Sequence, residues 1–316
     1  MIKDRFEMKQ STGKGWLAEV NLFLVVLMWG VNLPIMKFAL GRIDRFAFNA
    51  FRLTLSALVL GAIVHWLKLS TFDRSDGALS MRLQVIRLVL FALLTAFGYQ
   101  VLFLLGIDST SAGSTGVILS AIPMWIAILS FFILKERLGR GAWAGLSIAF
   151  AGVMIVTLYR SNTSSTESSL AGNLMVTSAA LCWAVGSVFS KPMLKNISPV
   201  ALTYASILMT LPLHYLVADN LSVEFGKLLN DGWLLAALFY SGVFSTGLAT
   251  AMWNIGVKQV GPSHAAGFQN LVPLIALASS WLLIGEVPVV QQLAGGALII
   301  VGLITMRMKR KLIAQN

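Results

Sequence analysis

Aromatic and amide side chains stand next to each other inside the long apolar runs of this chain. The two clearest pairs are Tyr99–Gln100 and Trp253–Asn254. A ring beside an amide suits a ligand with an apolar body and a polar head, so both pairs are candidate substrate-binding residues. Hydrogen bonding between membrane helices is the alternative role for the two amides.

Asn32 is a further amide within an apolar run, in the stretch WGVNLPIMK that spans 29–37. Pro34 lacks a backbone N–H, so a carbonyl one turn earlier loses its helical partner. Asn32 either points its amide at that gap or faces a substrate. The phrase recurs as WAVGSVFSK at 183–191, where Gly186 takes the place of the asparagine. We expect Trp29 and Trp183 in packing or cavity walls, because they lie away from the headgroup level.

Two further apolar runs, 113–134 and 264–284, carry polar residues near their starts and a proline near their middles. Helix starts present unpaired N–H groups and a positive dipole end, which can hold a carboxylate. This adds three candidate binding residues: Ser114, Gln269 and Asn270. Three prolines are expected to act in gating or as kinks, and simple kinks are the alternative: Pro34, Pro123 and Pro273.

Acidic side chains are absent from the middles of the runs, since all thirteen Asp and Glu residues fall in termini, loops or run ends. A proton-coupled mechanism would therefore have to use Glu136, Glu286 or His264. Facilitation or exchange is the preferred expectation. Lys37 and Lys191 lie at run ends, where lysine reaches water and anchors topology.

The composition favours lipid as the surrounding solvent. Hydrophobic residues make up 57% of the 316 residues, charged residues only 12%, and the mean hydropathy is +0.80. Soluble domains carry roughly 25% charged residues. The net charge of +11 comes from clusters between apolar runs and not from a basic face interleaved with aromatics, so no nucleic-acid partner is expected.

The same inventory argues against catalysis. The single cysteine and three histidines have no metal-ligand spacing, and no nucleophile–base pair or paired aspartates lie within the runs. We therefore expect no enzyme activity, no metal and no cofactor.

Runs of about 20 apolar residues are long enough to cross a membrane, and the chain contains ten of them. The predicted spans are 17–37, 46–67, 84–106, 113–134, 141–159, 171–190, 199–218, 233–256, 264–284 and 290–306. Eighteen basic residues fall on one predicted side and five on the other, which places both termini in the cytoplasm.

The chain also repeats itself. Pro123, Glu136, Gly145 and Gly152 recur 150 positions later as Pro273, Glu286, Gly295 and Gly302. Each half holds five spans, and an odd number forces the second half to enter the membrane inverted. The sequence thus predicts an all-α polytopic membrane protein with ten transmembrane helices in two inverted five-helix repeats, around a site near the midplane. The expected divisions are an N-terminal segment 1–16, repeats 17–159 and 171–306, a Ser/Thr-rich linker 160–170, and a basic tail 307–316.

Three stretches resemble the drug/metabolite transporter superfamily of the EamA-repeat type. They are WGVN in the first span, STSAGSTGVILSAIPMWIAILSFFILKERL through the fourth, and WNIGVKQVGPSHAAGFQNLVPLIALASSWLLIGE through the eighth and ninth. The resemblance implies a ten-helix carrier of small metabolites, with spans 1, 3, 4, 6, 8 and 9 lining the cavity and 5 and 10 peripheral. The chain departs from the repeat at Arg52. The first span recurs 154 residues later, and at that offset the second half has Ser206 in the position of Arg52.

The resemblance favours an amino-acid exporter of a bacterial inner membrane, working by alternating access on a small-molecule substrate. A carrier of sugars, nucleotide-sugars or other organic anions is the alternative on the same fold. Such a ligand would need several cations in the cavity. The chain is expected to act as a monomer or a homodimer, since GAWAG at 141–145 has the GxxxG spacing that packs helices within or between chains.

Overall fold

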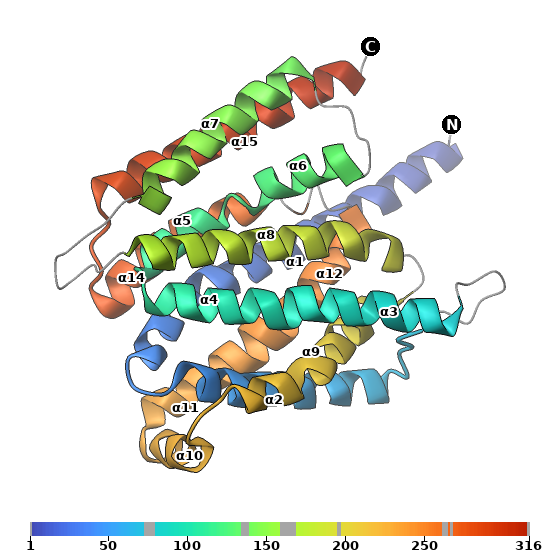
Figure 1. Cartoon of the computed structure of the whole chain (residues 1–316). Helices are drawn as coiled ribbons and strands as arrows, with labels where there is room; N and C mark the ends of the chain where they lie inside the picture. Colours follow the sequence, from blue (N-terminus) through green and yellow to red (C-terminus); the bar gives the residue numbers. More distant parts are fainter. Residues whose placement is uncertain are drawn as a thin grey trace.

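The computed structural model describes residues 2–72, 80–133, 139–158, 169–194, 197–260, 265 and 268–314. Regular structure within these ranges is helical throughout (Figure 1). The first repeat contains α1 (Ile2–Leu40), α2 (Arg45–Trp66), α3 (Met81–Ala92), η1 (Leu93–Gly98), α4 (Tyr99–Asp108), α5 (Ala112–Leu119), α6 (Ile122–Ile133) and α7 (Arg140–Leu158). The second contains α8 (Leu170–Met193), α9 (Pro199–Leu216), α10 (Leu221–Asn230), α11 (Gly232–Phe239), η2 (Tyr240–Leu248), α12 (Ala249–Val260), η3 (Gln269–Leu271), α14 (Val272–Ile284) and α15 (Val290–Ala314).

Each predicted span coincides with an apolar helical segment. Among the described residues, seven helices are long and apolar enough to cross a membrane, and shorter apolar helices occupy Trp143–Val156, Val272–Ile284 and Val290–Gly302. The prediction of an all-α polytopic membrane protein is confirmed. Large apolar side chains cover the outer surface, as expected where lipid replaces water.

Helices in corresponding positions of the two repeats make corresponding contacts with the other repeat. In the bundle, α1 packs against α12 and α14 of the second repeat, as α8 packs against α4 and α6 of the first. Likewise α2 packs on η2, and α9 packs on η1. Each repeat thus completes the core of the other, so the polar residues of both are brought to a shared centre.

The fourth and ninth spans are both interrupted just before a proline. The helix of the fourth span breaks between α5 and α6, ahead of Pro123. In the ninth, the short 3-10 turn η3 precedes α14, and Pro273 lies in the first turn of α14. Proline fits a first helical turn because its missing N–H would have no partner there. The first span behaves differently, since α1 continues through Pro34.

Two π-helical segments, η1 and η2, were not predicted. The two segments correspond in the repeat, because the 150-residue offset places η1 on the second part of η2. Side chains from other helices bond to carbonyls of both: Ser56 Oγ donates to the Gly242 carbonyl at 2.6 Å, and His214 Nε2 lies 2.8 Å from the Ala96 carbonyl. Wider π turns commonly mark functional positions in helices.

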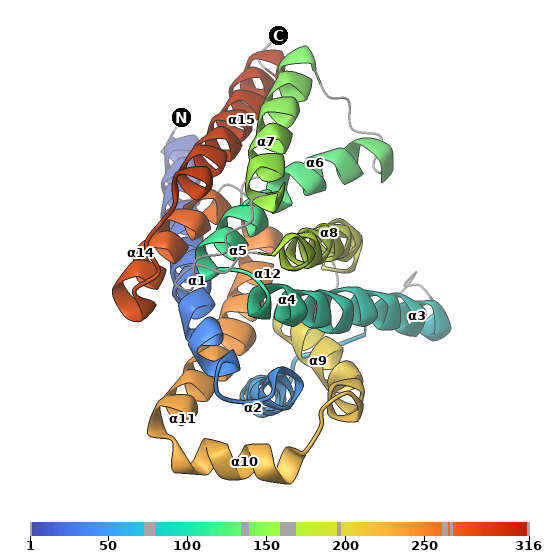
Figure 2. The ribbon, with the colours of Figure 1, turned by 60° about the vertical axis from the view of Figure 1, so that its left-hand side comes forward.

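Helices α7 and α15 lie side by side along one edge of the bundle (Figures 1 and 2). Glycines bring the two backbones together, because a Cβ at Gly302 would lie 2.5 Å from the Gly145 carbonyl and from the Ala149 backbone nitrogen. The GxxxG stretch at 141–145 therefore supplies Gly145 to packing within the chain.

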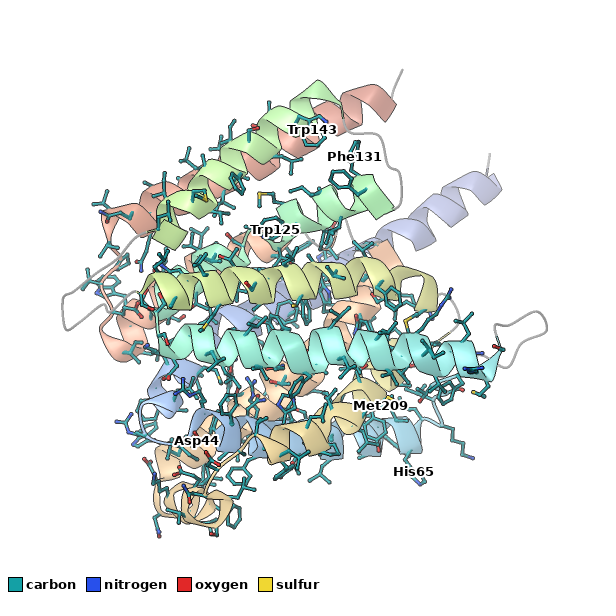
Figure 3. The ribbon with its side chains drawn as sticks, in the orientation of Figure 1. Asp44, His65, Trp125, Phe131, Trp143 and Met209 are labelled. Atoms are coloured by element: carbon teal, nitrogen blue, oxygen red, sulfur yellow. The ribbon has the colours of Figure 1, made fainter. Side chains whose placement is uncertain are left out.

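Helix α10 was also absent from the predicted elements. It lies across one end of the bundle between α9 and α11 (Figure 2). Figure 3 shows Asp44 at this end of α2 and His65 at the other. Glu224 of α10 accepts a hydrogen bond from the Asp44 backbone N–H at 3.0 Å and pairs with Lys227 at 2.7 Å. One carboxylate thus ties α10 to the turn between α1 and α2.

This tie predicts an acid-sensitive contribution to stability. Burial alone would raise the pKa of Glu224, but the hydrogen bonds from Lys227 and the Asp44 N–H outweigh it and lower the pKa. The carboxylate therefore stabilises the fold fully at pH values above about 4.3, the pKa of glutamate in the unfolded chain. This stabilisation is lost as the pH falls through the lower pKa of Glu224 in the folded protein. We expect Glu224→Gln to lose about 1 kcal/mol at about pH 7 and almost nothing at about pH 3.

Thermal unfolding of the purified protein in detergent measures both differences. Asp219→Asn is the matched control, because Asp219 is exposed in the neighbouring loop and should change stability at neither pH. An equal loss for Glu224→Gln at both pH values would contradict the assignment.

Candidate substrate cavity

A cavity lies where the two repeats meet. Its wall combines aromatic, amide and hydroxyl side chains with one cation: Trp29, Asn32, Leu33, Arg52, Tyr99, Gln100, Phe103, Leu119, Ile122, Trp183, Ser245, Thr246, Thr250, Gln269 and Val272. A second cavity shares Gln100, Trp183, Thr246 and Thr250 with it. It extends to Ser190 and Val257, near the ends of α8 and α12. The two cavities are therefore neighbours, with Arg52 in the wall of the first and the second lying towards the side predicted to be cytoplasmic.

Aromatic rings line the region that the two cavities share. The Trp29 ring centroid lies 5.7 Å from that of Trp183, edge to face, and 5.4 Å from that of Trp253. Tyr99 lies 5.0 Å from Trp183 and stacks on Phe103 at 5.7 Å. Such clustered rings offer apolar contact and electron-rich faces that attract cations.

Arg52 supplies the positive charge of the cavity, although it is only 2% exposed. Its Nε and Nη2 atoms both donate to Asn49 Oδ1, and Nη2 also donates to Gln100 Oε1 at 2.6 Å. Its Nη1 atom reaches Ser241 Oγ at 3.2 Å and Met36 Sδ at 3.3 Å. No carboxylate pairs with Arg52 among the described residues. A guanidinium held only by neutral groups in a buried site is a strong point of attraction for an anion.

Three cavity residues present buried polar atoms that have no hydrogen-bond partner in the described part of the chain. They are Asn32 Oδ1, Trp183 Nε1 and Gln269 Oε1. Buried polar atoms are costly without partners, because they have given up their bonds to water. The set contains two acceptors and one donor, so a ligand with both ammonium and carboxyl groups would match it.

Most of the predicted binding residues come together here. Five line the first cavity, and two more line the second alone: Asn32, Tyr99, Gln100, Trp183, Gln269, then Trp253 and Asn254. Ser114 lies elsewhere, because Gln292 Nε2 donates to its hydroxyl at 3.1 Å and to Ser111 Oγ at 2.8 Å. The side chain of Asn270 lies outside the described residues. Substrate contact by these residues remains a prediction.

The gap left by Pro34 is filled by another residue than Asn32. The Gly30 carbonyl, one turn before Pro34, accepts a hydrogen bond from Ser279 Oγ of α14 at 3.3 Å. Asn32 is therefore not needed to repair the helix, and its amide oxygen lies in the cavity wall without a partner among the described residues.

Of the three candidate coupling residues only Glu286 lies among the described residues, and it is not part of either cavity wall. Glu286 caps the start of α5, since its Oε2 accepts from the Ala112 backbone N–H at 3.2 Å. Glu136 and His264 lie outside the described residues. Lys37 also has a capping position, because its Nζ donates to the carbonyls of Ile107, Asp108 and Thr110 at 2.8–3.0 Å, at the end of α4. Lys37 therefore contributes to helix termination and not to the cavity wall.

The sequence pattern underrated Arg52 and gave no sign of its partner Asn49 or of His214, which bonds to Asn49. The signal for Arg52 was available, because a charged residue in a membrane span is expensive and usually functional. The mismatch with Ser206 in the second repeat drew attention away from it. His214 lies near the end of α9 in sequence, and only the packing of α9 on η1 and α2 shows that it is buried beside Asn49.

In the described part of the chain, seven spanning helices and three shorter apolar ones form two interlocking repeats around a central polar cavity, an architecture typical of polytopic membrane transporters. The EamA-like transporter family model matches residues 16–158 and again 170–308, and the chain belongs to that family. Two relatives share this length. The chain is 25% identical over 296 residues to "Uncharacterized transporter YyaM" of Bacillus subtilis, covering 92% of this chain and 94% of the relative.

The second relative is the "Probable amino-acid metabolite efflux pump" of Salmonella typhimurium, 24% identical over 301 residues, covering 93% of this chain and 94% of the relative. A crystal structure of a protein 19% identical in sequence matches with a TM-score of 0.65, covering 93% of this chain and 98% of that chain. At this identity the structural likeness shows the fold alone.

Proposed function

We propose that this transporter carries amino acids across a bacterial inner membrane, with Arg52 holding the substrate carboxylate. The observation that carries the proposal is the buried guanidinium in the cavity wall, which has no carboxylate partner among the described residues. A bound carboxylate would supply the missing negative charge and two acceptor oxygens in the planar arrangement that arginine recognises.

The aromatic residues give the other half of the recognition. Trp29, Trp183 and Tyr99 line the same cavity as Arg52, with Trp253 beside them. Their faces attract an ammonium group, and the amide oxygens of Asn32 and Gln269 are unpaired acceptors for its protons. Their edges pack against an apolar side chain. The site therefore favours zwitterionic amino acids with apolar or aromatic side chains, among which L-phenylalanine is a suitable probe.

The charge inventory argues against nucleotide-sugars and other multiply charged anions. Arg52 is the one cation that lines either cavity among the described residues. Lys37 is bound to carbonyls at the end of α4, and Lys258 is exposed. A single positive charge balances one carboxylate but leaves a pyrophosphate group with uncompensated charge in a low-dielectric site.

The elements around the cavity suit alternating access. The interrupted helices at Pro123 and Pro273 and the π-helical segments η1 and η2 lie in corresponding places in the two repeats. Rocking of one repeat against the other would bend these four positions while the site stays central. We propose efflux as the direction when amino acids accumulate inside, in keeping with the name of the Salmonella relative.

Counterflow into proteoliposomes tests the proposed substrate class. Liposomes loaded with unlabelled L-phenylalanine, glucose or a nucleotide-sugar receive the same compound in labelled form outside, and protein-free liposomes are the control. We expect accumulation of phenylalanine only. Accumulation of either sugar compound without any amino acid would overturn the proposal.

A further inference from the structure

The structure determines how hydrogen atoms are placed around Asn49, a buried residue of α2 between Arg52 and His214. A guanidinium only donates, so the atom of Asn49 that faces Arg52 must be the amide oxygen. The amide nitrogen therefore faces His214 Nδ1, at 3.1 Å. Since that nitrogen only donates, His214 Nδ1 must be the acceptor. The proton of the neutral ring is on Nε2, which donates to the Ala96 carbonyl at 2.8 Å.

In this arrangement Arg52 has no donor left for a ligand. Its Nε–H and one Nη2–H are directed to Asn49 Oδ1, the second Nη2–H to Gln100, and the two Nη1–H groups to Ser241 and Met36. The Nε/Nη2 edge is one of the two faces with which arginine binds a carboxylate through parallel hydrogen bonds. Asn49 therefore occupies an edge that the substrate would need.

A proton on His214 disrupts this arrangement. The imidazolium carries N–H groups on both ring nitrogens, so Nδ1–H would face the amide protons of Asn49. Turning the Asn49 amide over restores a bond to His214, because Oδ1 then accepts from Nδ1–H. The amide nitrogen now faces the Nε/Nη2 edge of Arg52, where donor meets donor. The Nε/Nη2 edge of Arg52 thereby loses its acceptor. A carboxylate can take that place with two acceptor oxygens.

We infer that His214 is a proton-binding site that opens Arg52 for the substrate carboxylate, so that proton and carboxylate bind together. The inference rests on the proposed function. In it His214 is a positioning residue that does not contact the substrate but acts through Asn49 on Arg52, which does. Charge acts in the same direction, because an imidazolium near a guanidinium in a buried site is unfavourable until an anion arrives. By linkage, each ligand raises the affinity for the other by the same factor.

Other titratable groups near α9 do not share this position. The elements packed most extensively against α9 are α2, α3, α12 and η1. The charged or titratable side chains of these elements are Arg45, Arg52, His65, Arg82, Arg87 and Lys258, with none in η1. On α9 itself, Tyr215 bonds to Thr54 at 2.8 Å, and Tyr204 is its other titratable neighbour. Among the charged side chains of these elements in the described chain, Arg52 is the one whose charge acts on His214.

Calorimetric binding of L-phenylalanine to the full-length protein in nanodiscs tests the inference, with buffers of different ionisation enthalpy to count protons. Between about pH 5 and pH 7 we expect tighter binding as pH falls, approaching tenfold per pH unit, with up to about one proton taken up per phenylalanine. Phenethylamine, which lacks the carboxylate, should bind without proton uptake.

Two variants should remove the pH dependence in opposite ways. His214→Gln keeps Asn49 on Arg52, so phenylalanine should bind weakly at every pH, about tenfold or more below the wild type in acid. Asn49→Ala frees the arginine edge permanently, so binding should be tight at every pH. His65→Gln, in an exposed histidine at the other end of α2, should behave like the wild type.

Each outcome decides a different statement. Phenylalanine binding by the wild type without proton uptake would overturn the coupling and leave the proposed function intact. A full pH dependence in His214→Gln would do the same. Absence of phenylalanine binding in every variant, Asn49→Ala included, would overturn the proposed function and the coupling with it.

Discussion

Arg52→Gln is expected to lower L-phenylalanine transport by about 100-fold while the protein still folds and inserts. Charge-assisted hydrogen bonds to a carboxylate contribute about 1.5–3 kcal/mol, and the variant loses both the charge and the paired donors. Glutamine keeps an amide NH2 group, whose two N–H donors can satisfy part of the network of Asn49 and Gln100. The loss should therefore appear in transport and binding more than in stability. Counterflow in proteoliposomes measures it.

Two comparison variants make this result specific. Arg42→Gln alters an exposed arginine that stacks on Phe38 in the turn after α1, and it should transport at the wild-type rate. Arg52→Lys keeps a charge without the planar pair of donors, so an intermediate rate is expected. Wild-type transport by a correctly folded Arg52→Gln protein would remove Arg52 from the site.

Gly302→Ala is expected to destabilise the protein by about 1–3 kcal/mol, the usual range for overpacking. The added methyl would lie 2.5 Å from the Gly145 carbonyl and from the Ala149 backbone nitrogen, and neither atom can turn aside as a flexible side chain would. Helices α7 and α15 must separate to admit it. The small residues that allow membrane helices to approach closely are thus the main support of this peripheral pair.

Gly296→Ala on the same helix is the matched control. A methyl there would lie 3.7 Å from Val117, an ordinary contact, so alanine should be tolerated and gain up to about 1 kcal/mol from its higher helix propensity. Thermal unfolding of both variants in detergent measures the contrast. Equal stability for the two variants would contradict the packing described for α7 and α15.

The architecture follows from the sequence because the bilayer imposes strong constraints. Apolar length identifies the spans, and the recurrence of Pro123 and Glu136 as Pro273 and Glu286 identifies the repeats. The π-helical segments η1 and η2 do not follow in this way. Their residues are ordinary helix formers in a membrane, and the wider turn depends on neighbouring side chains such as Ser56 that bond to their carbonyls.

The candidate site was partly predictable for a similar reason. Gln100 and Trp183 belong to spans that the repeat brings to the centre, and both line the cavity. Ser114 instead accepts a hydrogen bond from Gln292, which lies 178 residues later in the sequence. No local sequence pattern predicts this contact. The orientation of the Asn49 amide likewise depends on Arg52 and His214 approaching it from two different helices.

Competition between substrate analogues tests the central claim most directly, which is that this cavity recognises both ends of an amino acid. Labelled L-phenylalanine counterflow is measured against unlabelled L-phenylalanine, phenethylamine and 3-phenylpropionate, which lack the carboxylate and the ammonium group respectively. We expect each truncated analogue to compete at least about tenfold more weakly than phenylalanine, because each leaves either Arg52 or the aromatic cluster and its amide oxygens without a partner. Equal competition by phenethylamine and phenylalanine would contradict the assignment of the carboxylate to Arg52.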